Sequence, residues 1–220
     1  MDQNTPHSNY ATALQKARAL NGSQDFVEAE KAAVEAIGLM AASMSANNPR
    51  LADAYRLHTN ICVELSLTDL GHCKQWLAKA STSAAHRVEV LELGMLTADV
   101  IEAKRILAAI HFDSEKLPEA LTVLESARVQ IIELLDGEKP GVTFADFLGC
   151  SNSIAQALIG LSRDSEAVSL MAGSLHKVRA EHYRDLEVMK NFTVLSMLLT
   201  ELLAEQAALD AEAGDTADQG

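Results

Sequence analysis

The chain has 220 residues, of which 48% are apolar and 4% aromatic, and its formal net charge is −13. This length fits one or two domains, and the apolar content is enough for a continuous core. The acidic balance excludes the predominantly basic surface that binding to nucleic acid or to an anionic membrane requires.

The first residues of the chain have neither a basic segment nor an apolar segment of the kind found in a secretion signal. We expect no apolar run long enough to span a bilayer. The chain has three cysteines, an odd number, which favours reduced thiols over a disulfide framework. The sequence therefore predicts a cytoplasmic protein with neither a membrane nor a nucleic acid as partner.

The apolar residues are mainly Ala, Leu, Val, Ile and Met, without the alternation typical of strands, so the sequence predicts an all-α protein. Helix-ending signals divide the chain at Asn47-Asn48-Pro49, at Gly94 and at Asp136-Gly137. The predicted helices cover residues 8–21, 24–46, 50–66, 69–93, 96–112, 116–136, 143–161, 164–187 and 191–207.

A spaced pattern of small residues recurs along these helices. Ala29, Cys73, Ala120 and Ala167 each follow a turn signal, and they lie 44, 47 and 47 residues apart. Two antiparallel helices can approach closely where both carry small side chains, as at the predicted crossing of Ala17 with Ala29. A fixed period in this range indicates helical hairpins that stack into a solenoid.

The predicted organisation is an α-solenoid of about four antiparallel hairpins followed by a capping helix, residues 191–207, that covers the last apolar face. The hairpins span residues 8–46, 50–93, 96–136 and 143–187, within one repeat domain of residues 8–207. We expect residues 1–7 to be flexible and residues 208–220 to form an acidic disordered tail, since the end of the chain has no Lys or Arg.

The turn and second helix of two hairpins resemble the tetratricopeptide repeat (TPR). The resemblance rests on Asp25-Phe26 with Ala29, Ala33 and Ala36, and on Glu115-Lys116-Leu117 with Ala120, Leu124 and Ala127. The period is longer than the usual 34 residues, and it is similar to that of kinesin light chains, Rap-type peptide receptors and the sensor arms of MalT-type regulators. The resemblance implies a TPR-like right-handed superhelix.

The function that this resemblance implies is non-enzymatic: an adaptor, chaperone or regulator that binds a peptide or helix of another protein in a concave groove, with a homodimer left open. A peptide-sensing regulator of the Rap/MalT-like type is the alternative. If the first helix of each hairpin lines the groove, its binding residues are Arg18, Tyr55, His58, Thr59, Arg105, Asn152 and Gln156.

A basic, histidine-rich run stands out in the acidic chain, formed by His176, Lys177, Arg179, His182 and Arg184. Such cations can complement the dipole at the end of a helix. They could also form a secondary docking patch for an acidic partner, and the sequence does not decide between these interpretations.

Four soft ligands lie near the second predicted turn: His58, Cys62, His72 and Cys73. Their convergence would suit a helical metal or thiol sensor, although the spacing lacks the geometry of known zinc fingers, and Cys73 occupies a crossing position. We predict no resident metal or cofactor. Because the chain has no phosphate-binding Gly-rich loop, no HExxH motif and no nucleophile elbow, we also predict that it is not an enzyme.

Overall fold

The computed structural model describes residues 6–94, 97–137 and 141–217, and their side chains over residues 9–94, 97–137 and 141–209. All regular structure in these ranges is helical. The helices are α1 (Pro6–Gly22), α2 (Phe26–Ser43), α3 (Pro49–Thr68), α4 (Cys73–Glu92), α5 (Ala98–Asp113), α6 (Leu117–Asp136), α7 (Phe144–Gly160), α8 (Asp164–Leu175) and α9 (Leu186–Ala217), with two short 3-10 helices, η1 (Leu70–His72) and η2 (Ala180–Arg184).

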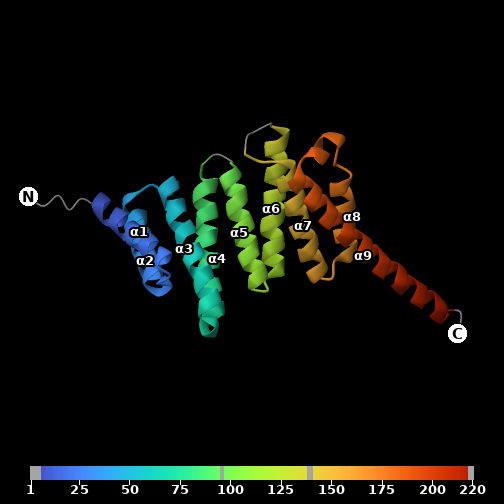
Figure 1. Ribbon diagram of the computed structural model, residues 1–220, viewed down its shortest axis with the longest axis horizontal. Coiled ribbons are helices and arrows are strands. Elements are labelled where there is room, and N and C mark those ends of the chain that lie inside the picture. Colours follow the sequence, from blue (N-terminus) through green and yellow to red (C-terminus); the bar gives the residue numbers. More distant parts are fainter. Residues whose placement is uncertain (1–5, 95–96, 138–140, 218–220) are drawn as a thin grey trace, which may run out of the picture. The chain divides into compact units, whose positions relative to one another are not determined.

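The chain divides into two compact units, Met1–Lys116 and Leu117–Gly220, where the sequence predicts one repeat domain. In the first unit α1 packs on α2, α2 on α3, α3 on α4, and α4 on α5 (Figure 1). In the second unit α6 packs on α7, α7 on α8, and α9 on both α7 and α8. This consecutive packing of helices confirms the predicted all-α solenoid fold class.

Three of the predicted hairpin turns share one backbone geometry. Gln24, Glu115 and Ser162 have left-handed φ values of 64°, 58° and 56°. In the first turn, the Asp25 amide donates to the Leu20 carbonyl at 3.0 Å and the Gln24 amide donates to the Asn21 carbonyl at 3.1 Å. Equivalent bonds follow α5 and α7. This is the Schellman arrangement, which ends a helix and reverses the chain.

The second turn is built differently, because η1 lies between α3 and α4. The Asp69 carboxylate accepts hydrogen bonds from Trp76 Nε1 and His72 Nδ1, both at 3.0 Å. Together these bonds, with the Trp76 bond the stronger influence, lower the pKa of Asp69. Cys73 begins α4 directly after η1 and is only half-buried, whereas Ala29, Ala120 and Ala167 are fully buried. The small-residue pattern therefore predicts three of the four buried positions.

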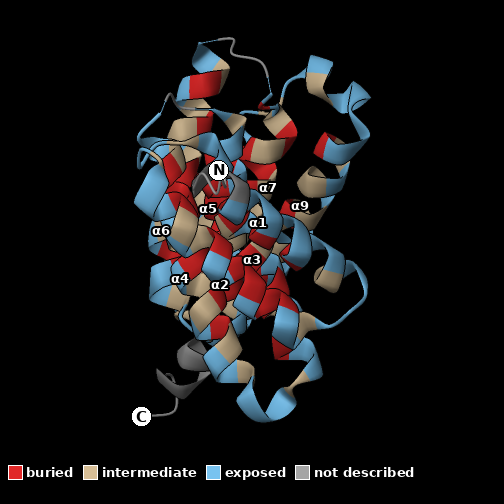
Figure 2. Cartoon of the chain, turned by 90° about the vertical axis from the view of Figure 1, so that its left-hand side faces the viewer, coloured by how far each residue is buried: buried red, intermediate tan, exposed pale blue. Residues whose placement is uncertain are grey.

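The core of the first unit is built from small side chains. One cluster centres on Ala17, Ala29, Ala32, Ala33, Ile61 and Leu65, and a second on Tyr10, Met40, Leu51, Ala52, Ala54 and Val90. Figure 2 shows buried positions in red alternating with exposed positions along the helices, as expected for amphipathic helices packed side by side.

The fourth hairpin differs from the sequence prediction. A helix is predicted over residues 164–187, but α8 ends at Leu175, and residues 176–185 form a connection that contains η2. Local propensity does not predict this break, because no Gly or Pro lies in the connection. Tertiary contacts hold the connection instead: the His182 ring stacks on Phe144 with a centroid separation of 4.0 Å.

The last helix is longer than the predicted capping helix. α9 runs from Leu186 to Ala217, so most of the predicted disordered tail is helical, consistent with its content of Ala, Glu, Leu and Gln. The flexible stretch predicted for residues 1–7 lies largely outside the described residues. Up to Leu209, where the description of side chains ends, Val188, Leu195 and Leu202 are the buried residues of α9, and Figure 1 shows the helix extending past α7 and α8.

The expectation that no apolar run is long enough to span a bilayer is wrong. Leu186–Leu209 has 24 residues and a mean hydropathy of 1.4, and only 11% of its apolar window is buried. The reason is the wide separation of its charged residues, which leaves an uncharged stretch between Lys190 and Glu201. Length and composition are all that this finding rests on, and the core helix of a soluble protein can meet the same criteria.

Candidate functional site

The second unit contains a cleft of about 750 Å³ where α6 ends and α7 begins, at the upper ends of these helices in Figure 1. The connection between α8 and α9 forms its third side. Its apolar lining consists of Ile132, Leu135, Val142, Phe144, Phe147 and Val188, and its polar lining of Asp136, Thr143, Lys177, Arg179, Glu181, His182 and Asp185.

The start of α7 positions the aromatic residues of the cleft. Thr143 caps the helix: its side chain accepts from the Asp146 amide, and the Asp146 carboxylate accepts from the Thr143 amide at 2.9 Å. This capping box fixes the first helical turn. Phe144 and Phe147, three residues apart, therefore lie on one face with ring centroids 5.3 Å apart.

The connection between α8 and α9 is fixed against this aromatic pair. His182 lies nearly parallel to Phe144, with an interplanar angle of 12°. Its Nδ1 accepts a hydrogen bond from the Arg179 amide at 3.1 Å. The neutral ring therefore carries its proton on Nε2, which is the nitrogen left to donate to another group.

The charged residues of the cleft differ in how far they are already engaged. Asp185 Oδ1 accepts from the amides of Glu187 and Val188 and so caps α9. Lys177 and Arg179 are exposed, and neither forms an ion pair with any residue that the structure describes. Lys177 Nζ lies 5.3 Å from the centroid of Phe147. The cleft thus combines an apolar floor with cations that have no counterion among the described residues.

Three residues of the predicted secondary docking patch, Lys177, Arg179 and His182, line the cleft, whereas His176 and Arg184 are exposed and are not among its lining residues. Sequence reasoning missed the apolar floor. The available signal was Phe144 and Phe147, two of only five phenylalanines in the chain, placed one helical turn apart directly after the potential N-cap residue Thr143.

The predicted groove residues differ in how far the structure exposes them. Arg18, Arg105 and Gln156 are exposed, and Tyr55 and Asn152 are half-buried. Gln156 Nε2 donates to Asn152 Oδ1 at 3.4 Å. His58 and Thr59 are buried, with 6% and 2% of their surface exposed, so the assignment of these two side chains to an open groove is corrected. Between Leu51 and Ser66 of α3, the exposed positions are instead Asp53, Arg56, Asn60 and Glu64.

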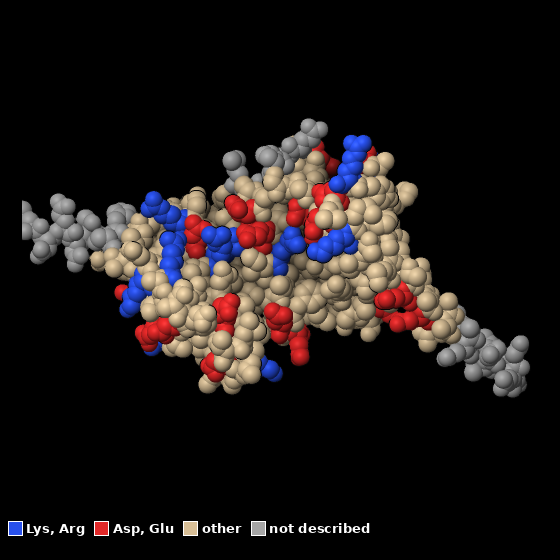
Figure 3. Space-filling model, viewed as in Figure 1, with Lys and Arg blue, Asp and Glu red and all other residues tan. Residues whose placement is uncertain are grey.

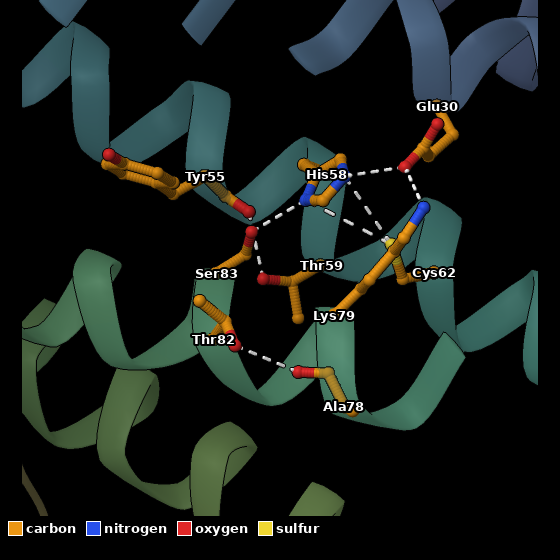
Figure 4. Close-up of polar contacts among 9 residues, drawn as sticks. All are labelled: Glu30, Tyr55, His58, Thr59, Cys62, Ala78, Lys79, Thr82 and Ser83. Carbon is orange, nitrogen blue, oxygen red and sulfur yellow. Dashed lines mark hydrogen bonds and ion pairs between the residues drawn. The ribbon is translucent and has the colours of Figure 1, made fainter. Parts of the chain in front are cut away.

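His58 belongs to a buried polar cluster that joins α2, α3 and α4 (Figure 4). Its Nδ1 lies 2.6 Å from Ser83 Oγ, and its Nε2 lies 3.6 Å from Glu30 Oε1. The same Glu30 oxygen pairs with Lys79 Nζ at 2.7 Å. Burial lowers the pKa of His58, and it outweighs the nearby Glu30 carboxylate, which acts in the opposite direction.

The residues proposed for a metal or thiol sensor do not converge. Cys62 Sγ lies 3.6 Å from His58 Nε2, but His72 is exposed and paired with Asp69. Burial, aided by Glu30, raises the pKa of Cys62 to about 12, so its thiol stays protonated and is a poor metal ligand. Over the part of the chain that the structure describes, no three His, Cys, Asp or Glu side chains are placed to hold a metal ion.

Surface charge is mixed over the rest of the molecule. Figure 3 shows Lys and Arg side chains interspersed with Asp and Glu on the visible face. Several exposed ion pairs of the described chain join side chains one helical turn apart, such as Lys31 with Glu28 at 2.6 Å and Arg163 with Glu166 at 2.7 Å. Exposed pairs of this kind contribute little to stability, and they satisfy the charges locally.

No protein-family model matches the chain, and no curated protein matches it in sequence. Solved structures do match its fold. A protein from Podosopora anserina, described as a kinesin light chain with nearly identical TPR-like repeats, is 16% identical with a TM-score of 0.58, over 96% of this chain and 99% of that one. A single-substitution variant of that protein gives 16% identity and a TM-score of 0.60, over 97% and 100%.

A Rap protein complexed with Competence and Sporulation Factor is 13% identical with a TM-score of 0.49, over 98% of this chain and 54% of that one. The two kinesin light chain matches, together with the consecutive packing of antiparallel helices, confirm the resemblance inferred from the repeat pattern. The chain has a TPR-like helical-repeat fold.

Proposed function

We propose that this protein is a non-enzymatic interaction module that binds a peptide segment of a partner protein in the cleft of the second unit. The observation that carries the proposal is the cleft itself, whose apolar floor is open beside the side chains of Lys177 and Arg179, which pair with no described residue. A stable protein rarely leaves apolar surface in a concave site without a use for it.

The dimensions of the cleft suit a short peptide. A volume of about 750 Å³ accommodates a few side chains, and Phe144, Leu135 and Val142 offer apolar contact to one or two of them. Burying one large apolar side chain contributes about 1.5–3 kcal/mol. Micromolar affinity, about 8 kcal/mol, therefore needs further anchors on the polar edge.

The TPR-like fold supports this proposal because helical repeats present extended surfaces without a reaction centre. The similarity to a kinesin light chain concerns the fold alone. Arg18 and Arg105 of the first unit, and Asn152 and Gln156 of the second, remain candidate contacts for other parts of the partner. A cytoplasmic location is part of the same proposal.

A phage-displayed library of random twelve-residue peptides, selected on the immobilised full chain, tests the proposal. We expect enriched peptides to share a large apolar residue and to bind with micromolar affinity. The variant Lys177→Ser/Arg179→Ser should bind them at least about tenfold more weakly, because charge-assisted contacts contribute about 1.5–3 kcal/mol. Circular dichroism of the variant should be unchanged, because both side chains are exposed.

The matched control is Lys74→Ser/Lys116→Ser, which makes the same charge change at two exposed lysines of the first unit. This variant should bind the selected peptides as the wild type does. Peptides that bind both double variants equally well would place the binding surface elsewhere, and a selection that enriches no sequence would contradict the proposed function.

A further inference from the structure

The α6 wall of the cleft continues to Arg128. Ile132 and Leu135 line the cleft, and Arg128 lies four and seven residues before them. Positions with this spacing share one face of a helix. The Arg128 side chain also reaches Phe147, another lining residue, with its guanidinium carbon 5.0 Å from the ring centroid. Arg128 is not itself a lining residue, but it lies directly behind one of them, Phe147, and on the same helix face as two others.

The orientation of Arg128 is fixed by α7. Its Nε donates to Ser151 Oγ at 3.2 Å, and Ser151 is fully buried and donates in turn to the Phe147 carbonyl at 2.9 Å. The guanidinium is thus held by one hydrogen bond and by the ring of Phe147, which is 1% exposed. Only Nε is used in this arrangement, so the two Nη groups remain available to donate.

Arg128 differs from the other buried or half-buried Lys and Arg residues of the described chain, which are paired with carboxylates. Arg87 Nη2 lies 2.7 Å from Glu102, Lys104 Nζ lies 2.6 Å from Glu92, and Lys79 Nζ lies 2.7 Å from Glu30. Arg128 is half-buried, yet no described carboxylate pairs with it and its Nη groups bond to no described residue. Partial burial lowers the pKa of Arg128, consistent with a cation that lacks a counterion.

We propose that Arg128 is the anchor for a carboxylate of the bound peptide, which its two Nη groups contact side by side. The proposal rests on the proposed peptide-binding function of the cleft. Lys177 Nζ also contacts the Phe147 ring, 5.3 Å from its centroid, and adds a second positive charge beside this ring. The ligand is thus a peptide whose carboxylate lies next to a large apolar side chain, because the apolar floor adjoins the guanidinium.

Nitrogen-15 NMR of the full chain with small probes tests this assignment. N-acetyl-phenylalanine joins a carboxylate to an aromatic ring, and its primary amide is the uncharged control. With the acid, up to about 20 mM, we expect shifts of the Arg128 Nε–H signal and of backbone amides around the cleft. The amide should bind at least about tenfold more weakly and leave the Arg128 signal in place.

The variants Arg128→Gln and Arg128→Lys should both lose this preference for the acid, because lysine cannot supply a planar pair of donors. A third probe, N-acetyl-aspartyl-phenylalanine amide, carries its carboxylate on a side chain. If it binds better than N-acetyl-phenylalanine, the natural carboxylate belongs to Asp or Glu, and the reverse order indicates a chain terminus.

The outcomes separate the two proposals. If the acid and the amide shift the cleft amides equally while the Arg128 signal stays unmoved, the carboxylate anchor is wrong and the peptide cleft stands. The same conclusion follows if Arg128→Gln keeps the preference for the acid. If no probe shifts any cleft signal, neither proposal survives.

Discussion

The buried polar cluster of the first unit and the cleft of the second unit use the same side-chain types in opposite ways. In the cluster, Glu30 lies against both Lys79 and His58, and burial removes all but the lysine from water. In the cleft, Lys177 and Arg179 have no ion-pair partner among the described residues, and His182 keeps Nε2 free to donate. The polar groups of the cluster are paired with one another, whereas the cleft has hydrogen-bond donors that no described residue accepts from.

This difference shows which polar groups fix a fold and which are available to a ligand. Buried polar groups are costly unless they are satisfied by one another, so a closed cluster mainly fixes how its helices pack. Unpaired charges on an open apolar surface cost little until a partner arrives. Whether a polar group is already paired within the protein therefore distinguishes a structural cluster from a binding site better than its residue type does.

The sharpest test of the closed cluster is the reactivity of its thiol. With its pKa raised to about 12, Cys62 should be alkylated by iodoacetamide on the order of a thousandfold more slowly than an ordinary exposed thiol at pH 8. Cys73 is half-buried at the start of α4 and should react first. Mass spectrometry of the alkylated peptides at successive times measures both rates.

Unfolding in guanidinium before alkylation serves as the control for this measurement, since all three cysteines should then react alike. Rapid alkylation of Cys62 in the folded protein would show that the cluster opens to solvent, and the thiol-sensor interpretation would gain support.

The next largest effect is expected from Glu30→Ala, which leaves His58 and Lys79 without their shared carboxylate. We expect a loss of about 2 kcal/mol in the free energy of unfolding, because Lys79 can still reach water while the buried site loses its hydrogen bonds. Glu181→Ala, an exposed acid at the cleft, should change stability by less than about 0.5 kcal/mol. Urea unfolding measures both changes. If Glu30→Ala and Glu181→Ala lowered the free energy of unfolding equally, the buried cluster would contribute no more to stability than an exposed acid at the cleft.

Much of the fold is predictable from the sequence because its signals are local and repeated. The buried Ala29, Ala120 and Ala167 and the turns that precede them recur at a fixed spacing, and the same backbone geometry follows in all three places. The fold class needs no more than this periodicity.

The sites are less predictable because they depend on contacts between distant residues. His58 and Cys62 share a face of α3, but only the packing of α2 and α4 shows that this face is buried. Likewise, the connection after the break at Leu175 packs through the stacking of His182 on Phe144, 38 positions earlier in the chain. A single sequence contains no local signal for either contact.

The pH dependence of stability provides a further comparison. The folded-state pKa of His58 lies below its ordinary value of 6.5, so the unfolded chain binds the proton first as the pH falls. The contribution of His58 is therefore complete above about pH 6.5 and declines as the pH falls toward the lowered folded-state pKa.

Urea unfolding at steps between about pH 7.5 and about pH 5 measures this decline, and His58→Gln should make it shallower. The exposed His176→Gln change is the control and should leave the slope unaltered. If the free energy of unfolding falls equally steeply with pH in the wild type and in His58→Gln, the cluster admits water and His58 titrates as in the unfolded chain.

The smallest change in stability is expected at two of the three turns of shared geometry, one from each unit. Gln24 and Ser162 are exposed, and each holds a left-handed conformation that costs a side-chain-bearing residue about 1 kcal/mol. Gly removes that strain but gains freedom in the unfolded chain, so Gln24→Gly and Ser162→Gly should each stabilise by about 0.5 kcal/mol. Gln15→Gly, at an exposed position inside α1, should instead destabilise by about 1 kcal/mol.

Thermal unfolding of the turn variants also compares the two units directly, because each turn substitution acts on only one of them. If the units unfold independently, Gln24→Gly raises one transition and Ser162→Gly the other. A single transition that both raise equally would show that the closed cluster and the open cleft belong to one cooperative structure.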